Sequence, residues 1–586
     1  MYLKSINIKS FRCIKDQTIE FHKGVNILIG ENNTGKTAIL DAMRLCLGFG
    51  LERRELYFQI ENFHIDNSGV QCNIAEFHLV FSELTSREQG IFVEMLSISE
   101  DGNPELALHV QFFYDMEKDR MRVKYWGGEN EGQDIPHQIL ELLYYTHLGA
   151  LRDATHDLAP CRGNKISQLF LKLIANEEQR QQLSNNMNNS IKNAANWRNL
   201  LNRGKRKIMD HLERVTLQNE ESNIEIDFVE ATFRKIVENL KIYIPVQAIS
   251  DKELEEEGSV ERENINFNIS QNGLGYNNLI YAATVLGDLL ERRVSEPDSF
   301  IALLIEEPEA HLHPQWQNIL FSYLQEIETK GMQVFITSHS PTITAKTDIN
   351  SIIVLTRSDD NIKSIPLRSI DISDKHKKYL QRFLDVTKCQ LFFAKSVILV
   401  EGISESILMP SFAKIIGDAY HLEKNAVEVV NINGVAFEPF ANLFNKENER
   451  ERINIKCSIV TDDDRDEGEV SSRAVKALEL KRGMVEVYLA RKTFEYELYL
   501  ENESLIKTAY AEIHTQTNLD FEGQSIEECA EQFIEKLNRN RDKAVFAQHL
   551  ANKIEEDSDF KLNFKLPEYI ENAIKWAVSG NEQDTN

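Results

Sequence analysis

The chain has 586 residues, of which 42% are hydrophobic, and a formal net charge of -27 at pH 7. That length is enough for roughly three or four domains, and the acidic balance argues against a general nucleic-acid coat protein. It does not exclude an enzyme with acidic metal sites and a locally basic DNA channel. The seven cysteines form no Cys-x-x-Cys pair, which indicates neither a zinc site nor a disulfide framework. Because no signal-peptide pattern and no apolar run of about 20 residues is present, a soluble cytoplasmic protein is expected.

The first 30 residues alternate apolar and polar side chains, which predicts short strands. The apolar run 25–29 leads into Gly-x-x-x-x-Gly-Lys-Thr, and an apolar helical pattern follows at 39–47. Strand, glycine loop and helix are the context that a phosphate-binding loop requires. Its backbone N–H groups would surround a phosphate, Lys36 would reach the β- and γ-phosphates, and the Thr37 hydroxyl would bind Mg²⁺. The predicted nucleotide-binding residues are Gly30, Asn32, Asn33, Thr34, Gly35, Lys36 and Thr37.

Further strand-like runs follow at 75–81, 106–114 and 121–126, and another apolar strand precedes the charged pair Arg152-Asp153. This pair fits a surface salt bridge at a strand end. It equally fits a functional arrangement in which Arg152 lies near the nucleotide or a partner subunit.

From 165 to 245 Gly and Pro nearly vanish while apolar residues keep a helical spacing, which predicts two or three inserted helices. Such an insertion could dimerise subunits or bind DNA, and a plain helical packing unit is at least as well supported. The strongly acidic run 251–263 is expected to be a solvated loop.

Two later strands are expected to deliver polar side chains to one edge of a sheet. The buried strand 300–305 ends in Glu306 and Glu307, at the end where α/β proteins bind ligands. Glu306 is suited to the Mg²⁺ shell and Glu307 to orienting an attacking water, since adjacent buried carboxylates are otherwise costly. The strand 333–337 ends in Ser-His-Ser-Pro, whose His339 could contact the γ-phosphate.

Together with the opening Ile-Asn-Ile-Lys-Ser-Phe-Arg segment, these motifs resemble the ABC-type ATPase heads of the RecF and SMC group. In that group the phosphate-binding loop of one head faces a signature glycine loop of another head. Gly273 and Gly275, which open a helical pattern, match that loop, and Asn272 stands where the family usually has Ser. Both glycines could bring backbone N–H groups to a phosphate. The resemblance implies a homodimer or higher homo-oligomer formed through the heads and the helical insertion.

The C-terminal half carries a second set of acids at strand ends. One short strand ends in Glu401, with Glu405 one turn away on an expected helix. A later strand ends in three aspartates, of which Asp462 and Asp464 would project on the same side under period 2. Alone, the run 462–466 fits a solvated acidic turn. Together with the first strand end, it predicts a carboxylate cluster for one or two Mg²⁺ or Mn²⁺ ions, which suits phosphodiester cleavage.

This pattern resembles the Toprim domain of topoisomerases, primases and certain nucleases. Two later segments support it: Lys-Thr-Phe-Glu-Tyr-Glu-Leu and Lys-Ala-Val-Phe-Ala-Gln. An ABC-type head followed by Toprim is characteristic of the OLD-family (overcoming lysogenisation defect) nucleases, which the chain resembles over nearly its whole length. The resemblance implies a lysine, Lys543, that offsets charge at the scissile phosphate, and Thr493 replaces the serine often found there. The implied metal ligands are Glu401, Glu405, Asp462, Asp464, Thr493 and Glu495.

The predicted fold is α/β, in four parts. Residues 1–164 and 251–385 would form an ABC-type ATPase head, 165–250 a helical dimerisation insertion, and 386–586 a Toprim nuclease domain with a C-terminal helical extension. ATP is expected to regulate a DNA endonuclease that uses Mg²⁺ or Mn²⁺. The predicted catalytic residues are Glu401, Glu405, Asp462, Asp464, Lys543 and, in the head, Glu307.

The OLD family also implies phage defence, in which members act alone, with a helicase in the Gabija system, or as retron effectors beside a reverse transcriptase. No membrane partner is expected. The main alternative is a RecF- or SMC-like repair ATPase whose Toprim domain only binds. A topoisomerase would need an identifiable tyrosine nucleophile and a primase a zinc module, whereas a transporter subunit has no role for Toprim acids. The net charge of -27 predicts salt-sensitive DNA contact through local Lys and Arg patches.

Overall fold

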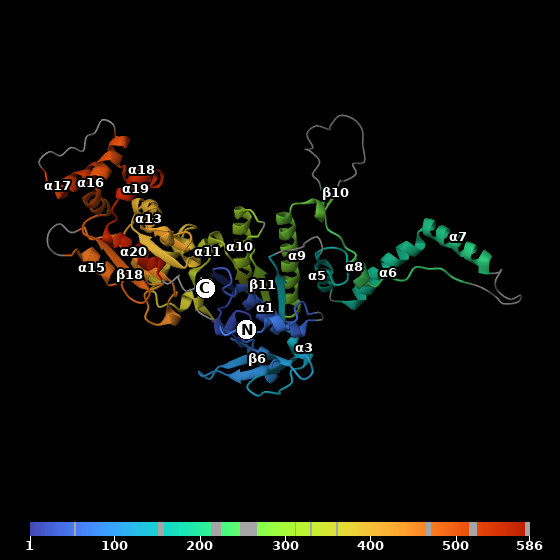
Figure 1. Cartoon of the computed structure of the whole chain (residues 1–586). Helices are drawn as coiled ribbons and strands as arrows, with labels where there is room; N and C mark the ends of the chain where they lie inside the picture. The colour runs from blue at the N-terminus through green and yellow to red at the C-terminus, as the bar shows by residue number, and fades with distance from the viewer. Residues whose placement is uncertain are drawn as a thin grey trace, which may run out of the picture. The chain divides into compact units, whose positions relative to one another are not determined.

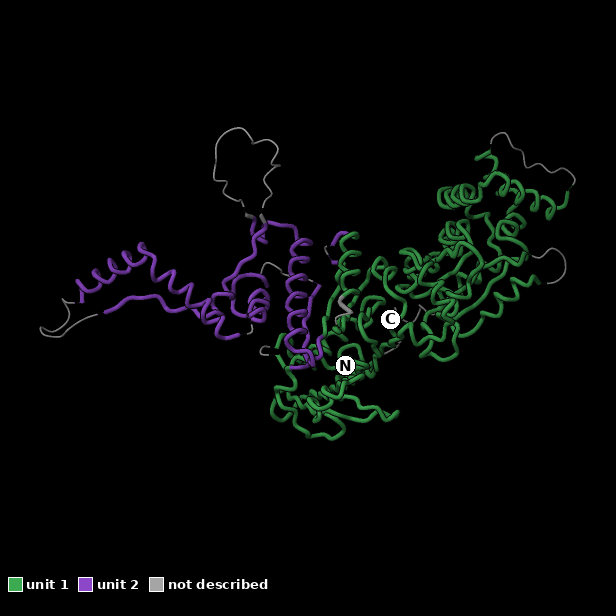
Figure 2. The backbone as a smooth tube through the Cα atoms, turned by 180° about the vertical axis from the view of Figure 1, so that it is seen from behind, with its two compact units in different colours: residues 1–141, 302–309, 314–586 green, residues 142–301, 310–313 purple. Residues whose placement is uncertain are grey.

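The computed structural model divides into two compact units, which Figure 2 colours separately. Unit 1 comprises 1–141, 302–309 and 314–586, and unit 2 comprises 142–301 and 310–313. The residues that the structure describes are 1–51, 54–150, 157–174, 176–212, 224–245, 266–310, 312–328, 331–358, 361–464, 470–514 and 524–579. The predicted Arg152-Asp153 pair, the acidic run 251–263 and Asp466 lie outside these residues.

Unit 1 begins with an antiparallel sheet in the order β2-β1-β4-β6-β5, with β7 also paired to β6. The alternation that predicts these strands places Leu3, Ile6 and Ile8 of β1 in the core. The strands expected at 75–81, 106–114 and 121–126 are β4, β6 and β7. The bounds are β1 (Tyr2–Phe11), β2 (Ile14–Glu20), β4 (Ile74–Ser82), β5 (Leu96–Ile98), β6 (Pro104–Asp115) and β7 (Arg120–Gly127), with the short helices α2 (Ser86–Ile91) and α3 (His137–Leu140).

A second sheet of unit 1 runs in the order β14-β13-β3-β12-β11. Its inner strands are parallel, and β3 and β12 are buried throughout and mainly apolar, as expected for strands covered on both faces. Parallel pairing brings the ends of β3, β11 and β12 to one edge. The strands are β3 (Val25–Gly30), β11 (Phe300–Glu306), β12 (Gln333–Thr337), β13 (Ile352–Ser358) and β14 (Asn361–Pro366), and the helices are α1 (Lys36–Leu47), α10 (Pro314–Glu328), α11 (Pro341–Lys346) and α12 (Asp374–Phe383).

The C-terminal part of unit 1 contains a parallel sheet in the order β16-β15-β17-β18 (Figure 1). Helix α20 packs on β15, β17 and β18, and α13 packs on α18 and α20. The strands are β15 (Ser396–Val400), β16 (Val427–Asn431), β17 (Lys456–Asp462) and β18 (Val485–Ala490). The helices are α13 (Ile403–Ile416), α14 (Glu438–Ala441), α15 (Ser472–Leu478), α16 (Phe494–Ile513), α17 (Ile526–Asn540), α18 (Lys543–Glu556), α19 (Ser558–Asn563) and α20 (Glu568–Val578).

Unit 2 contains the predicted helical insertion (Figure 1). Helix α5 packs on α8 and α9, and Lys172 of α5 forms a 2.6 Å ion pair with buried Asp288 of α9. The guanidinium of Arg292 lies 3.6 Å from the ring centre of Tyr144. Helix α7 has no fully buried side chain, and its Trp197 ring packs edge-on against Phe228 with centroids 5.3 Å apart. The elements are β8 (Leu143–Leu148), α5 (Lys165–Leu173), α6 (Glu177–Asn193), α7 (Ala195–Leu212), α8 (Phe233–Glu238), β9 (Tyr243–Pro245), β10 (Asn266–Asn268) and α9 (Leu274–Ser295).

The α/β class is therefore confirmed, and the region 165–245 is helical as predicted, although it contains four described helices, α5 to α8, where two or three were expected. Dimerisation through them stays a prediction. None of the described helices has the length and apolar character that a membrane crossing requires.

Candidate functional site

The glycine loop after β3 has the backbone that a phosphate-binding loop needs. Gly30 and Gly35 have φ values of 146° and 82°, and Asn33 between them has a φ of 62°. A Cβ on Gly30 would collide with the carbonyl oxygen of Leu355. The loop therefore requires glycine at Gly30 for two reasons, backbone conformation and space.

Lys36 lies folded into this loop. Its Nζ donates to the carbonyl oxygens of Gly30, at 3.0 Å, and of Glu31. Burial lowers the pKa of Lys36 to about 8, although Glu307 and Glu31 act in the opposite direction. A buried ammonium bonded mainly to carbonyl oxygens lacks a full anionic partner, which a triphosphate would supply. In the same loop Thr34 is buried, while Asn32, Asn33 and Thr37 are exposed.

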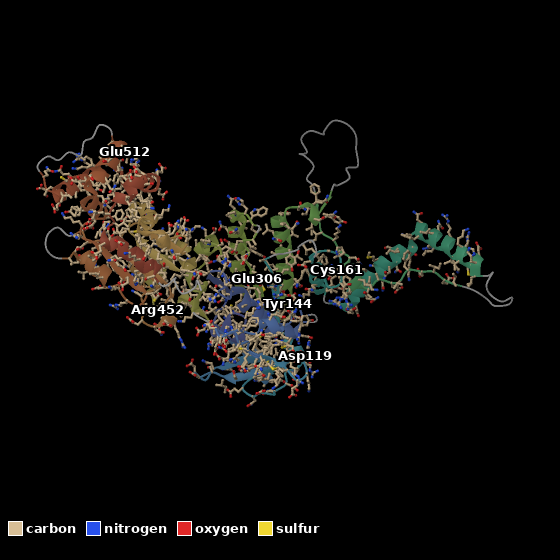
Figure 3. All side chains as sticks on the ribbon, viewed as in Figure 1. Asp119, Tyr144, Cys161, Glu306, Arg452 and Glu512 are labelled. Atoms are coloured by element: carbon tan, nitrogen blue, oxygen red, sulfur yellow. The ribbon has the colours of Figure 1, made fainter. Side chains whose placement is uncertain are left out.

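The ends of β11 and β12 bring further polar groups into the surroundings of Lys36. Glu306 ends β11 opposite Thr337 of β12, and Figure 3 labels it. Glu307 has a φ of 41°, which turns the chain out of the strand. The Nε2 atom of His339 lies 3.8 Å from its Oε1 atom. Burial and then the charge of Lys36 lower the pKa of His339.

Glu309 is a third carboxylate at this edge, and the motif analysis did not assign it a role. Its Oε1 atom accepts from the Ser338 hydroxyl at 2.9 Å and from the His339 N–H at 2.7 Å. Its other oxygen is buried and has no hydrogen-bond partner among the described residues. Burial raises its pKa. Glu309 thus holds the backbone of His339, and the Glu-Glu-Pro-Glu spacing was the signal that could have identified it.

The predicted signature glycines lie in unit 2, whereas the phosphate-binding loop lies in unit 1. Helix α9 begins at Leu274, so only Gly273 precedes it and Gly275 lies in its first turn. Both glycines therefore stand at the start of the helix, Gly273 as its N-cap and Gly275 within its first turn. A Cβ on Gly273 would meet no atom within 4 Å, so the loop around it is open.

The second candidate site is built by the parallel pairing of β15 with β17. Val400 is opposite Val460, so Glu401 follows directly beside Thr461. Its Oε1 atom accepts from the Thr461 hydroxyl and, at 3.0 Å, from the Asp462 N–H. The sheet register, fixed by two apolar strands, therefore brings the two predicted acidic strand ends together.

Helices supply the remaining acids. Glu405, in the first turn of α13, is buried, and burial, then Glu495 and Glu401, raise its pKa to about 7. Burial and then Glu401 and Glu405 raise the pKa of Asp462 well above its usual value. The Nζ atom of Lys543 lies 3.1 Å from the Oε2 atom of Glu495. The charges of Glu401 and Glu495 thus act on both Glu405 and Asp462, and the charge of Lys543 acts on Glu405.

Thr493 occupies the N-cap of α16, where its hydroxyl accepts from the Tyr496 N–H at 3.4 Å. The same turn carries Glu495. Capping fixes the start of this helix and hence the position of that carboxylate.

Asp464 does not lie on strand β17, although the sequence analysis predicted that it would project from that strand beside Asp462. Strand β17 ends at Asp462, and Asp464 has a φ of 51°, so the period-2 pattern does not extend to it. Asp463 between them is fully buried and accepts from the Ser471 N–H at 2.8 Å. The inference that Asp462 and Asp464 project together from one strand is therefore wrong, because a left-handed turn replaces the strand.

Arg473 on α15 is a site residue that the sequence did not reveal. Its guanidinium forms ion pairs with both Glu401 and Asp464. Tyr569 on α20 is another: its buried hydroxyl has no hydrogen-bond partner among the described residues, and its pKa is raised by burial, then by Asp462 and Glu405. An arginine or tyrosine many residues from the acids carries no recognisable spacing, so only the fold brings them together.

The donor set fits a divalent cation. Burial and neighbouring carboxylates raise the pKa of Glu405 and of Asp462, and a dication would neutralise that excess negative charge. Among the described residues no three His, Cys, Asp or Glu side chains already surround a common metal position. Glu401 and Asp464 both contact the guanidinium of Arg473 instead.

The raised pKa of Glu405 predicts how the metal-free protein responds to pH. Its folded pKa of about 7 exceeds its ordinary value of 4.5, so between these values the unfolded state binds fewer protons. The stability that protonated Glu405 confers on the folded protein at low pH is therefore lost as pH rises from about 4.5 to about 7. Glu405→Gln should remove this loss and raise the free energy of unfolding by up to about 3 kcal/mol near pH 7.5 in EDTA.

Urea unfolding at pH 5 and pH 7.5 measures this difference. The exposed Glu423 provides the matched control, because Glu423→Gln leaves the cluster unchanged. An equal stability difference between Glu405→Gln and wild type at both pH values would contradict the electrostatic account.

Comparison with known proteins agrees with this arrangement. The family described as "AAA ATPase domain" matches residues 1–344, and the "Overcoming lysogenization defect protein-like, TOPRIM domain" matches residues 392–464. "Endonuclease GajA" of Bacillus cereus (strain HuB5-5) is 24% identical over 98% of this chain and 99% of its own length. "Old nuclease" of Escherichia phage P2 is 24% identical over 78% of each chain.

Among solved structures, the C-terminal region of the Burkholderia pseudomallei OLD protein is 25% identical, with a TM-score of 0.25, and covers 32% of this chain and 97% of its own. The two family matches confirm an ATPase head followed by a Toprim domain. The chain belongs to the AAA ATPase family, carries an OLD-like Toprim domain behind its ATPase domain, and is homologous to Endonuclease GajA and Old nuclease.

Proposed function

We propose that this protein is a DNA endonuclease that uses Mg²⁺ or Mn²⁺ in its Toprim domain and is regulated by ATP in its head. The observation that carries the proposal is the partly buried carboxylate cluster at the ends of β15 and β17. Glu401, Glu405 and Asp462 come from two strand ends and a helix; besides burial, the charge of Glu401 raises the pKa of Glu405, and the charges of both raise the pKa of Asp462. Structural acids are seldom buried together in this way, because each raises the electrostatic cost of the next.

Homology to two proteins named as nucleases, one of them over 98% of this chain, supports nuclease activity. The alternative, a repair ATPase with a binding-only Toprim domain, gives no reason for the convergence of Glu405, Asp462 and Lys543. We retain the boundaries 1–164, 165–250, 251–385 and 386–586 as proposed limits of the two ATPase parts, the insertion and the nuclease domain.

The proposed metal ligands are drawn from the cluster and its neighbours. A bound Mg²⁺ or Mn²⁺ would supply an activated water and charge stabilisation at the leaving oxygen. Lys543 would neutralise part of the charge that develops on the scissile phosphate, and its contact with Glu495 orients it. Arg473 would have to release Glu401 and Asp464 before both could bind metal. The proposed ligands are Glu401, Glu405, Asp462, Asp464, Thr493 and Glu495.

The head would bind ATP through the loop that contains Lys36. Thr37 is exposed in the first turn of α1, as a hydroxyl that binds the nucleotide's Mg²⁺ must be. Glu306 would join that metal's shell, Glu307 would orient the attacking water, and His339 would contact the γ-phosphate. These residues serve nucleotide binding and hydrolysis, so we assign DNA cleavage to the Toprim cluster and control of cleavage to the head.

We further propose that two heads associate, with Gly273 and Gly275 of one copy near the nucleotide of the other. Helix α7, which buries no side chain within the described chain, supports a role of the insertion in association. DNA is the proposed substrate. A phage-defence role and a helicase or reverse-transcriptase partner stay predictions from the family resemblance.

A plasmid assay tests the central proposal. Purified full-length protein should nick or linearise supercoiled plasmid when Mg²⁺ or Mn²⁺ is added, and EDTA should stop the reaction. Cleavage that continues unchanged in EDTA, or no cleavage with either ion with and without ATP, would reject the proposal.

A further inference from the structure

A cleft of about 1130 Å³ opens within unit 1 beside the carboxylate cluster. Side chains of α12 and α15 line it, and so do residues around α14. Thr461 and Arg473, the two residues whose side chains donate to Glu401, also line it. The cleft therefore leads to a carboxylate that we propose as a metal ligand.

The lining of this cleft is basic, in contrast with the chain's net charge of -27. Five cations line it in addition to Arg473, and all five are exposed: Lys375, Lys378, Arg382, Lys476 and Arg482. None of the five forms an ion pair with any residue that the structure describes. Only two carboxylates lie in the described lining, Glu438 and Glu479, and the former lies 3.8 Å from His376.

The spacing on α12 concentrates three of these charges. Lys375, Lys378 and Arg382 are separated by three and four residues, so they share one face of the helix. Like charges on one helix face repel one another, and such a row gains stability from a polyanion that binds across it. The regular spacing favours a ligand with repeated negative charges, such as the phosphates of a nucleic acid.

An aromatic pair on the same helix adds a different kind of contact. The rings of Tyr379 and Phe383 are stacked, with centroids 4.1 Å apart and planes 15° apart. Both residues line the cleft, and Phe383 is 44% exposed. An exposed ring such as that of Phe383, beside a row of cations, is a surface on which an unpaired base can stack while its phosphates contact the cations.

We propose that this cleft binds a single strand of DNA and guides its backbone to the Toprim carboxylates. The proposal rests on the proposed nuclease function for its choice of DNA. In an intact duplex the base faces are covered by their neighbours, so an aromatic platform favours an unpaired strand. Lys375, Lys378 and Arg382 would contact phosphates, Phe383 would stack on a base, and Lys476 would continue the contacts toward Arg473.

Fluorescence anisotropy in EDTA tests the cleft without any metal-dependent cleavage. The probes are a labelled oligonucleotide of about 20 nucleotides and the duplex of the same sequence, titrated with the full chain at several salt concentrations. Wild type should bind the single strand more tightly than the duplex. The Lys378→Glu/Arg382→Glu variant should bind the single strand at least about tenfold more weakly, with a salt slope smaller by about 1.4, since each lost phosphate contact removes about 0.7.

Phe383→Ala should weaken single-strand binding about five- to tenfold without changing the salt slope, because stacking releases no counterions. The matched charge control is Lys424→Glu/Arg539→Glu, which reverses two exposed cations away from the cleft. The matched aromatic control is Tyr57→Ala, at a ring that is 64% exposed. Both controls should bind within twofold of wild type, and thermal melts should show that all variants are folded.

The outcomes separate the two proposals. Wild-type affinity in both cleft variants overturns the cleft proposal, and so does tighter binding of the duplex than of the single strand. If wild type binds the single strand in EDTA and the cleft variants do not, the cleft proposal stands even when no cleavage occurs with Mg²⁺ or Mn²⁺. If wild type cleaves DNA, and Lys378→Glu/Arg382→Glu binds and cleaves DNA as well as wild type does, the cleft proposal is rejected. The proposed nuclease function then stands.

Discussion

Asp462→Asn is expected to abolish plasmid cleavage, with a fall in rate of at least about a thousandfold. Asp462 ends β17 directly beside Glu401, and buried negative charge surrounds it. Asparagine keeps the size of the side chain but loses the charge and one of the oxygen donors that a hard divalent cation prefers. Initial rates of supercoiled plasmid loss, measured at saturating Mg²⁺ or Mn²⁺, give the size of the effect.

The structural control for this substitution is Asp418→Asn, at an exposed aspartate outside the cluster. It should cleave at the wild-type rate. Asp462→Asn should also be at least as stable as wild type in EDTA, because it removes a charge whose burial is unfavourable. Addition of Mn²⁺ should then raise the melting temperature of wild type more than that of Asp462→Asn. A folded Asp462→Asn protein that cleaves like wild type would refute the assignment of the Toprim site.

The sequence predicted those parts of the two sites that depend on short-range pattern. An apolar run followed by Gly30 and Lys36, or by Glu306 and Glu307, specifies both a strand and what stands at its end. Parallel strands have their C-terminal ends at the same edge of the sheet. Glu401 therefore lies beside Thr461, which is 60 positions later in the chain, and beside the Asp462 that follows it. Period and strand polarity were sufficient for this inference.

The parts that the sequence did not predict depend on turns and on tertiary contact. Asp464 lies where the chain has left the strand through a left-handed residue, and no period describes such a turn. Arg473 reaches the acids because α15 returns beside β17, and Tyr569 because α20 packs on the same strand. The sequence predicted local Lys and Arg patches but not the position of the basic cleft, since its cations are scattered between 375 and 482.

Arg473 connects the carboxylate cluster with the basic cleft. Its guanidinium pairs with Glu401 and Asp464 and at the same time lines the basic cleft. A DNA phosphate arriving along the cleft would compete for this guanidinium, and the two carboxylates would then be available to a cation. Substrate entry and metal binding are therefore expected to favour each other through one side chain.

Lys36→Ala is expected to lower the affinity for ATP by about a hundredfold while leaving the Toprim domain folded. The Nζ atom of Lys36 is buried among carbonyl oxygens of its own loop, and a triphosphate offers it charged oxygen partners instead. Hydrogen bonds that involve a charged partner contribute about 1.5–3 kcal/mol each, and two such bonds account for an effect of this size. Titration of a fluorescent ATP analogue measures the affinity.

The same variant separates regulation from cleavage. Without nucleotide, Lys36→Ala should cleave plasmid at the rate of nucleotide-free wild type, because the substitution lies in the head and not in the carboxylate cluster. Any change that ATP causes in the wild-type rate should disappear in the variant. Lys23→Ala is the matched control, since Lys23 is exposed and forms a surface ion pair with Glu83, and it should respond to ATP as wild type does. If ATP changed the cleavage rate of Lys36→Ala as strongly as that of wild type, control of the nuclease could not lie in this loop, because the lysine that should hold the β- and γ-phosphates would be absent.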